Sequence, residues 1–478
     1  MIEVEEFYFV KRVVSDTYKE IIDKVYAAEQ GHVLRFWPEL NDSERAQLAR
    51  QLNEIDFDLH CRLRRKYILS NNPGQVPHDL EPAEFIPLPK NRAGRDAWNN
   101  ARTVGVRALR DGRVAAFLVA GGQGSRLGYD GPKGKFEVTP VKKKSLFQLQ
   151  AEKIRALSKR HRIVIPWYIM TSETNHNETV SYFEDNDYFG LGRENVILFP
   201  QAMVPALDAN GRLFLETKST IFRNPNGHGG SLAALNSSGA LDDMKRRGIE
   251  YVFYFQVDNV LINICDPVFL GFHIQGEADM SAKIVEKSDP EEKVGVIGRI
   301  EGRLGVIEYS DLPHELKYAQ NDDGTLRFRA GSIAIHIFNV AFVEQENQGG
   351  FHLPWHLAKK QIPFVDENGN TVTPDEPNGY KFETFVFDAL NDAKRAVFLE
   401  VDRAEEFSPV KNAEGVDSPA TAETHMIAQF ARWLTAAGIP YPKSTKVEIS
   451  PLFALDEEEF VAKVDRNLKV GNELYIGA

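Results

Sequence analysis

The feature that most constrains this chain is a glycine-rich loop that directly follows an apolar segment. The apolar segment, Val114–Ala120, has the length and composition of a buried parallel strand. Residues 121–134 then read GGQGSRLGYDGPKG. Successive backbone N–H groups that glycines leave exposed after a strand bind phosphate. Since Arg126 and Lys133 add two cations, the loop predicts a site where a nucleotide is transferred between phosphates.

Two common glycine loops do not fit this stretch. The dinucleotide-binding fingerprint is G-x-G-x-x-G, whereas Gly122–Gly128 has the spacing G-x-G-x-x-x-G, one residue too long. The P-loop needs G-x-x-x-x-G-K-[ST], but Gly134–Phe136 reads GKF and Tyr129 stands where the first glycine belongs. An ordinary glycine turn with surface cations is the alternative. The number of glycines and the Pro-Lys-Gly that follows favour the phosphate site.

Composition narrows the class of protein. The formal net charge of −12 and the lack of a basic block argue against a general nucleic-acid binder. Cys61 and Cys265 are too few for a disulfide framework and lie outside zinc-binding spacings, so we expect a reducing cytoplasm. The acidic N-terminus does not resemble a signal peptide. The longest apolar runs fall far short of the ~20 residues that a membrane helix needs, so we expect no membrane partner.

The pattern of apolar residues predicts an α/β fold in three consecutive parts. Residues 1–100 are predicted to be helical, with a Pro- and Asn-rich linker at Asn71–Arg95, and residues 404–478 a small C-terminal lobe. Between them, strands alternate with helices over 101–403, which favours a mixed, mostly parallel sheet flanked by helices. The predicted strands are Val114–Ala120, Ile163–Met170, Val196–Phe199, Tyr251–Val257, Ala282–Val285 and Ile333–Phe338.

In the N-terminal part, Thr17 and Glu20 have the spacing of a capping box for a helix over Tyr18–Val25, which Gly31 can close. A second helix is expected from Asn41 or Asp42. Its apolar stripe is Leu48, Leu52, Ile55 and Leu59, which we assign to core packing.

In the central part, Ser145 and Gln148 form a second capping-box pair, ahead of a helix. Val294–Gly298 and Arg303–Tyr309 are predicted to pair as a hairpin inserted in the sheet. A further helix is expected at Thr421–Ala437, in the C-terminal lobe.

Other polar residues stand where a ligand of the sheet is expected. Ligands of open parallel sheets bind beyond the carboxyl ends of the strands, and Asp258 ends the strand Tyr251–Val257. A carboxylate facing a phosphate loop suits Mg²⁺, although an Asp-Asn pair also favours turns. The glycine segment Asn226–Ser231 precedes a predicted helix, Leu232–Leu241. It is equally an anion site or a plain helix entry.

Many short blocks of the sequence are similar to one known family. The glycine loop resembles that of the eukaryotic-type UDP-sugar pyrophosphorylases, and within them most resembles the UDP-N-acetylhexosamine (UDP-N-acetylglucosamine) pyrophosphorylases. The likeness extends over nearly the whole chain. The matching blocks are Leu34–Trp37, Pro166–Ser172, Tyr188–Leu191, Val257–Asn259, Val285–Lys287, Val306–Ser310, Phe385–Asp388, Phe407–Asn412 and Glu448–Leu452.

The resemblance implies a nucleotide-diphospho-sugar transferase fold with a Rossmann-like core, and it implies roles for single residues. The nucleotide-binding residues would be Ala120, Gly121, Gly122, Gly124, Gln201, Gly227, Asp258 and Lys381, with Gln201 at the uracil. The catalytic cations would be Arg126, Lys133 and Lys411, and Asp258 would hold Mg²⁺. The sugar-binding residues would be His228, Asn259, Gly295, Glu308, Ser332, Phe385 and Phe387.

The implied reaction joins UTP and a sugar 1-phosphate into UDP-sugar and pyrophosphate in the cytoplasm, by a monomer or weak homo-oligomer. N-acetylglucosamine 1-phosphate is the expected sugar substrate. The family commonly has Asn at the positions of His228 and Ser332, and serine lacks the amide donor and acceptor. A UDP-glucose or broad-specificity pyrophosphorylase is therefore the first alternative. A non-catalytic UDP-sugar-binding regulator is a distant one, because the cations and Asp258 are retained.

Overall fold

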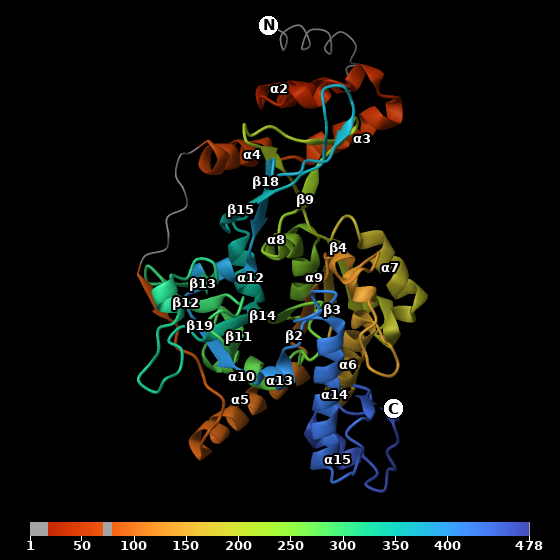
Figure 1. Ribbon diagram of the computed structural model, residues 1–478, viewed down its shortest axis with the longest axis vertical. Coiled ribbons are helices and arrows are strands. Elements are labelled where there is room, and N and C mark those ends of the chain that lie inside the picture. Colours follow the sequence, from red (N-terminus) through yellow and green to blue (C-terminus); the bar gives the residue numbers. More distant parts are fainter. Residues whose placement is uncertain (1–17, 70–78, 478) are drawn as a thin grey trace. The chain divides into compact units, whose positions relative to one another are not determined.

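The computed structural model (Figure 1) describes residues 18–69 and 79–477, which fall into two compact units. The first unit combines the described residues of Met1–Val76 with Ala202–Gly230 and Pro354–Phe385. The second combines those of Pro77–Gln201, Ser231–Leu353 and Val386–Ala478. Neither unit is one consecutive segment. The division into domains at about residues 100 and 403 stays a prediction, since these units follow other boundaries.

A ten-stranded mixed sheet forms the centre of the second unit. Its parallel half has the order β10, β2, β3, β4 and carries the glycine loop at the end of β2. These strands are β2 (Val114–Val119), β3 (Trp167–Thr171), β4 (Val196–Pro200) and β10 (Tyr251–Gln256). Strands β2, β3 and β10 are almost completely buried because both faces are covered, as the continuous apolar runs predicted, whereas the edge strand β4 is only partly buried.

The other half of the sheet is largely antiparallel. The long strand β14 (Ala330–Asn339) runs antiparallel to both β10 and β11. The predicted hairpin is confirmed, because Val296 pairs with Ile307 and Ile300 with Arg303. The strands on this side are β1 (Leu80–Pro82), β11 (Met280–Glu286), β12 (Val296–Ile300), β13 (Arg303–Ile307) and β19 (Ala396–Glu400), the last parallel to β11. The predicted α/β class with a mixed sheet is thus confirmed.

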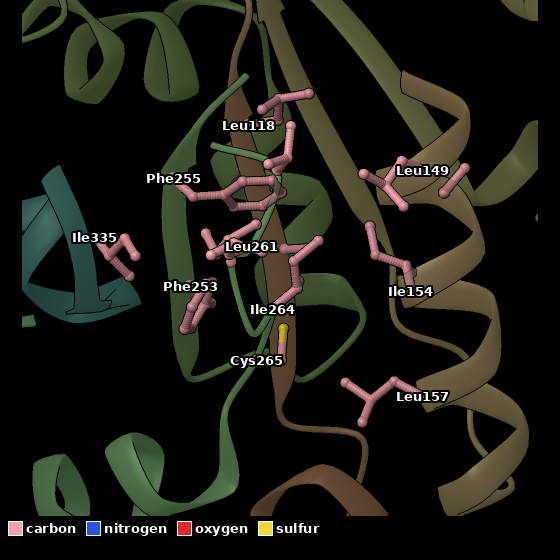
Figure 2. Packing of buried hydrophobic residues seen from close by; sticks show 14 of the residues in the cluster. Leu118, Leu149, Ile154, Leu157, Phe253, Phe255, Leu261, Ile264, Cys265 and Ile335 are labelled. Atoms are coloured by element: carbon pink, nitrogen blue, oxygen red, sulfur yellow. The ribbon is translucent and has the colours of Figure 1, made fainter. Parts of the chain in front are cut away.

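Helices cover this sheet, and helix α6 (Leu146–His161) packs against the face below β2 and β10. Figure 2 shows Leu149 and Ile154 of α6 facing Phe253 and Phe255 of β10, with Leu261 and Ile264 between them. The other main helices of the unit are α5 (Arg92–Arg110), α7 (His176–Asp185), α9 (Ala240–Arg246), α10 (Pro267–Gln275), α12 (Val340–Glu346), α14 (Pro419–Ala436) and α15 (Glu457–Lys463). Helix α8 (Gly230–Ser237) begins at the boundary between the units.

The first unit has a core of its own, built from short helices and strands. Helices α2 (Lys19–Ala27), α3 (Asp42–Glu54) and α4 (Phe57–Leu63) contribute buried side chains to it, together with Phe382. Its sheet has the order β15 (Trp355–Lys360), β18 (Gly379–Thr384), β6 (Leu207–Asp208). Two-stranded pairs join β5 (Met203–Pro205) to β9 (Arg223–Pro225), β7 (Leu215–Thr217) to β8 (Thr220–Ile221) and β16 (Phe364–Val365) to β17 (Thr371–Val372).

Several predicted helix ends are wrong, for local reasons. Thr17, half of the first predicted capping box, lies outside the described residues. Helix α2 ends at Ala27, so Gly31 starts a separate 3₁₀ turn and does not close it. The single helix predicted from Asn41 is two, because Asp56 accepts a hydrogen bond from Leu59 N and so begins α4.

Four further predictions differ from the structure, all of them outside the N-terminal helices. Only half of the Ser145 capping box forms: Gln148 N donates to Ser145 Oγ, but the Gln148 side chain donates to Glu152 and does not accept from Ser145 N. The predicted linker Asn71–Arg95 contains β1 and the start of α5, while residues 70–78 lie outside the described part. The predicted strand from Ile163 begins only at Trp167, and the helix predicted at Leu232–Leu241 is split between α8 and α9.

The contact between α5 and α10 leads to a stability prediction. The two helices approach so closely at Gly271 that a Cβ there would lie 1.7 Å from Ala101 O. Gly271→Ala should therefore lower the free energy of unfolding by about 1–3 kcal/mol, since overpacking forces the helices apart. Urea denaturation measures this change. Gly471→Ala is the control, because a Cβ there meets nothing within 4 Å, and equal stability of both variants would contradict the prediction.

Candidate active site

The glycine loop after β2 closes on itself through backbone hydrogen bonds. Gly124 N donates to Gly131 O at 2.9 Å, and Lys133 N donates to Gly122 O at 3.1 Å. Gly128 adopts a left-handed conformation with φ of 68°, which glycine reaches at no steric cost. The loop is thus a pinned turn that starts and ends beside the strand, and Lys133 lies at its closing end.

One side of this loop is open and rich in donors. A Cβ placed on Gly122 would meet no atom within 4 Å. Over residues 18–69 and 79–477, the amides of Gly121, Gly122 and Gln123 donate to no backbone or side-chain acceptor. Consecutive amides without partners are the arrangement that binds anions. An open run of amides, which an anion-binding site requires, is therefore present at Gly121–Gln123, and phosphate binding there stays a prediction.

Asn175 braces the loop from the next strand, a role that we did not predict. Its side chain donates to Ala120 O at 3.0 Å and to Gly122 O at 3.4 Å, and it accepts from Ser172 N at 2.8 Å. The residue is fully buried. It follows the carboxyl end of β3, so the rule that singled out Asp258 after β10 would have found Asn175 as well.

Lys133 and Asp258 form an ion pair beside the loop. Lys133 Nζ lies 3.3 Å from Asp258 Oδ2, and the side chains are only 15% and 12% exposed. Such a pair is poorly screened by solvent. The pairing joins the end of the loop after β2 to the end of β10, the edge at which the sequence placed the ligand.

Asp258 fits the predicted magnesium role. Among the described residues no group of three or more His, Cys, Asp or Glu could hold a metal ion. Mg²⁺ is usually bound by one or two carboxylates, several waters and substrate phosphates, and not by an all-protein cage. Asp258 Oδ1 accepts no hydrogen bond in the described part of the chain, so one carboxylate oxygen is open to a cation.

Lys411 is brought to the same place by backbone pairing. Val410 N donates to Asp258 O at 3.0 Å, and Val260 N donates to Ser408 O at 3.2 Å. Asn259 fastens the two segments, because its side chain donates to Glu406 O at 2.7 Å and accepts from Ser408 N at 3.0 Å. The predicted contact of Asn259 with the sugar stays a prediction. In the structure, its side chain connects these two segments.

Gln201 lies against the start of the loop. A Cβ on Gly121 would lie 3.1 Å from Gln201 Nε2, and Gln201 N is held by Thr171 O at 2.9 Å. The amide of Gln201 is thus fixed next to Gly121 at the end of β4. An amide in that position is suited to the donor and acceptor edge of a base.

Three of the predicted sugar-binding residues lie together on the antiparallel side. Ser332 N donates to Gly295 O at 2.9 Å, so β14 and the entry of β12 are joined there. A Cβ on Gly295 would lie 3.5 Å from Glu308 Oε1, which comes from the end of β13. Gly295, Glu308 and Ser332 therefore form one cluster that the hairpin builds.

The first unit holds the remaining glycine segment, which packs on the end of β18. A Cβ on Gly227 would lie 2.4 Å from Thr384 O, and one on Gly229 would lie 2.7 Å from Phe385 N. Glycine is needed at both positions because the backbone at the end of β18 packs too closely for a side chain. The same contacts place His228 in a stack on Phe385, with ring centroids 5.3 Å apart and an angle of 27° between the planes.

His356 joins this stack, which the sequence did not predict. Its ring lies 4.4 Å from that of Phe385, at an interplanar angle of 30°. Burial, and secondarily the nearby His356, lowers the pKa of His228 to about 4. His228 is therefore a neutral imidazole over the physiological range, offering one donor and one acceptor. His356 lies on β15 opposite Glu383 of β18. Only this long-range strand pairing brings it to Phe385, so local sequence does not mark it.

The other predicted residues fall in separate places. Lys381, in the first unit, lies over the ring of Phe222 at 5.0 Å, and desolvation lowers its pKa. Arg126, in the second, is exposed and forms no ion pair within the described chain. Phe387, also in the second, packs against that unit's core.

Comparisons with known proteins show the family to which this chain belongs. Residues 88–473 match the family model of UTP–glucose-1-phosphate uridylyltransferase. The chain belongs to this uridylyltransferase family. It is 40% identical over 439 residues to the human UDP-N-acetylhexosamine pyrophosphorylase-like protein 1, covering 88% of this chain and 86% of that one. It is 36% identical to the UDP-N-acetylglucosamine pyrophosphorylase of Saccharomyces cerevisiae, covering 88% and 92%.

A solved structure extends the likeness to three dimensions. The uridine diphosphate N-acetylglucosamine pyrophosphorylase from Trypanosoma brucei, crystallised with an inhibitor, matches with a TM-score of 0.83 and 30% identity. The match covers 97% of this chain and 99% of that one. Among the described residues, no helix has the length and apolar character that a membrane crossing requires.

The brace on the glycine loop gives a second prediction. Asn175→Ala removes both amide donors and the acceptor for Ser172 N, leaving buried backbone groups unsatisfied. We expect a loss of about 1–3 kcal/mol in unfolding free energy, together with weaker binding of UTP, measured by calorimetry. The control is Asn186→Ala, which is exposed. UTP affinity equal to wild type would show that the brace does not shape the loop.

Proposed function

We propose that this protein is a uridylyltransferase that makes UDP-N-acetylglucosamine and pyrophosphate from UTP and N-acetylglucosamine 1-phosphate. The observation that carries the proposal is the Lys133–Asp258 pair beside the open amides of Gly121–Gln123. It places a cation, a carboxylate and an anion-binding main chain at one sheet edge. The uridylyltransferase family and the names of the relatives support the same activity.

The reaction that this arrangement serves is an in-line displacement. A phosphate oxygen of the sugar 1-phosphate attacks the α-phosphorus of UTP, the bond to the β-phosphate oxygen breaks, and pyrophosphate departs as an anion. The nucleophile is already an anion, so no general base is needed. The protein contributes positioning and neutralisation of charge. In this proposal Lys133 and Lys411 act at the α-phosphate and attacking phosphate, while Arg126 and the loop amides hold the pyrophosphate.

Mg²⁺ is part of the proposal and would be held by Asp258. When bound, the ion would neutralise charge on the phosphate oxygens. Lys133 would keep the carboxylate of Asp258 oriented toward the loop. The proposal also places the protein in the cytoplasm, which the two free cysteines, Cys61 and Cys265, support. It takes the protein to be a monomer or weak homo-oligomer.

The sugar is proposed from the relatives, and the chain's own departures keep one alternative. Ser332 lies in the cluster with Gly295 and Glu308, and His228 stacks on Phe385. Both stand where the resembling enzymes commonly have Asn. Solved structures named as UDP-glucose phosphorylase or UDP-glucose pyrophosphorylase share the fold at 15–17% identity, with TM-scores of 0.53–0.58. A UDP-glucose or broad-specificity enzyme is the second candidate, whereas a non-catalytic regulator would have no use for the retained ion pair.

Pyrophosphate release tests the activity and the sugar together. Wild-type protein is incubated with UTP, Mg²⁺ and, in turn, the 1-phosphates of N-acetylglucosamine, N-acetylgalactosamine and glucose. We expect the highest kcat/KM with N-acetylglucosamine 1-phosphate. Lys133→Ala should lower kcat by about 100- to 1000-fold, as loss of a charge-stabilising donor does. Lys135→Ala is the matched control. Lys135 lies on the same 3₁₀ turn as Lys133, but it pairs with Glu178 and not with Asp258.

Two results would contradict this. Full activity of Lys133→Ala would remove the catalytic role of the ion pair. A preference of wild type for glucose 1-phosphate would support the UDP-glucose alternative.

The metal role generates a prediction of its own. Asp258→Asn replaces a charged oxygen ligand with a neutral one, which a hard cation binds more weakly. We expect the Mg²⁺ concentration for half-maximal rate to rise by about tenfold or more, since a close charge pair contributes more than one factor of ten at a partly buried site. Titrating Mg²⁺ at saturating UTP measures it. Asp242→Asn, an exposed residue of α9, is the control. An unchanged Mg²⁺ response would mean that Asp258 is not the ligand.

A further inference from the structure

Helix α6 carries the turn that presents Asp258. Gln150 Nε2 donates to Val257 O at 2.9 Å. One turn further along the helix, Lys153 Nζ donates to Val260 O and to Ile262 O, each at 2.8 Å. Residues three apart on a helix share a face. The two side chains therefore hold the main chain on both sides of Asp258.

The same helix also holds the other partner of the ion pair. A Cβ on Gly134 would lie 2.2 Å from the ring of Phe147, so the residue after Lys133 rests directly on α6. Leu146 N donates to Phe136 O at 3.0 Å, which ties the start of the helix to the end of the loop. Both partners of the ion pair are thus supported from one helix. Figure 2 shows Leu149 and Ile154 of this helix facing Leu261, which follows Asp258 in the turn.

Glu406, whose carboxylate attracts the ammonium of Lys153, belongs to a buried cluster of charges. Lys283 is fully buried and lies 2.9 Å from Asp266 and 2.5 Å from Glu406. Desolvation lowers the pKa of Lys153 to about 7, and the attraction of Glu406 opposes that shift.

Glu406 connects this support to the segment of Lys411. Its carboxylate accepts from Asn263 N at 3.2 Å, at the far end of the Asp258 turn. Its backbone carbonyl accepts from the side chain of Asn259 at 2.7 Å. Lys153, Glu406 and Asn259 therefore hold the turn at several points along its length. Lys411 lies five residues after Glu406 in the segment that pairs with this turn.

We infer that Lys153 is a positioning residue for uridylyl transfer, which fixes the Asp258 turn against Lys133 through the carbonyls of Val260 and Ile262. It does not touch substrate. The inference rests on the proposed function and adds a residue that acts through Asp258. A displaced carboxylate would misplace the charge that faces the α-phosphate, whereas the amides of Gly121–Gln123 would stay in place.

The test replaces Lys153 without emptying its space. Lys153→Met keeps the side-chain length and removes the donors. We expect kcat to fall by about ten- to a hundredfold, as small misplacements at a reacting centre do, while the Kd for UTP stays within about twofold, since the loop amides that bind phosphate are untouched. Lys153→Gln keeps an N–H donor and should recover part of kcat. A merely structural role would not separate kcat from UTP affinity in this way.

Hydrogen–deuterium exchange supplies a readout that needs no activity. Lys153→Met should speed exchange of the amides of residues 257–263 and leave those of β2 as in wild type. Lys159→Met is the matched control, because Lys159 lies exposed on the same helix and its side chain forms no hydrogen bond or ion pair with any described residue. If Lys153→Met fails to fold, Gln150→Leu removes the bond to Val257 O instead and should give the same local loosening and a smaller fall in kcat.

Three results decide the inference. A kcat of Lys153→Met within about twofold of wild type would overturn the inference, because loss of the support should cost at least one factor of ten in rate, or about 1.4 kcal/mol. Exchange at residues 257–263 that equals wild type would overturn it as well. A parallel loss of kcat and UTP affinity with faster exchange throughout the unit would also overturn it in favour of general destabilisation. Absence of pyrophosphate release by wild type would refute the proposed function alone, since the exchange comparison still tests the support of the turn.

Discussion

The contact between Lys133 and Asp258 is the interaction on which the site of the second unit depends. It joins the end of the glycine loop to the end of β10, two segments that are far apart in sequence and adjacent in the parallel sheet. A close, poorly solvated ion pair holds its partners only where the backbone positions both of them. Helix α6 provides that positioning, through Phe147 under Gly134 and through Gln150 and Lys153 under the Asp258 turn.

Glycine is required for different physical reasons in the two units. In the loop after β2, Gly122 is open, which leaves its amide accessible to a phosphate. At Gly227 and Gly229 the reason is contact, because β18 passes where a Cβ would be. One residue type thus exposes main chain in the second unit and allows the His228–Phe385 stack in the first.

Local patterns predicted much of this correctly, and the errors have identifiable causes. The strand before the glycine loop and the 296–307 hairpin follow from apolar runs and turn residues, which act over a few positions. The helix that was predicted across Ile55 failed because Asp56 offers a better cap, a competition that apolar spacing does not register. Asn175 was missed although its place after a strand end marks it, whereas Lys153 was missed because a single lysine on a helix carries no signal of its own.

The sequence by itself determined the chemistry that is available: a glycine loop with two cations, a carboxylate at a strand end, and the family to which the chain belongs. Only the tertiary structure decided which of these groups meet. Lys411 reaches the Asp258 turn because Val410 pairs with Asp258, and His356 reaches Phe385 because β15 pairs with β18. Such register is fixed by backbone hydrogen bonds and packing between distant segments, and no local stretch of residues encodes it.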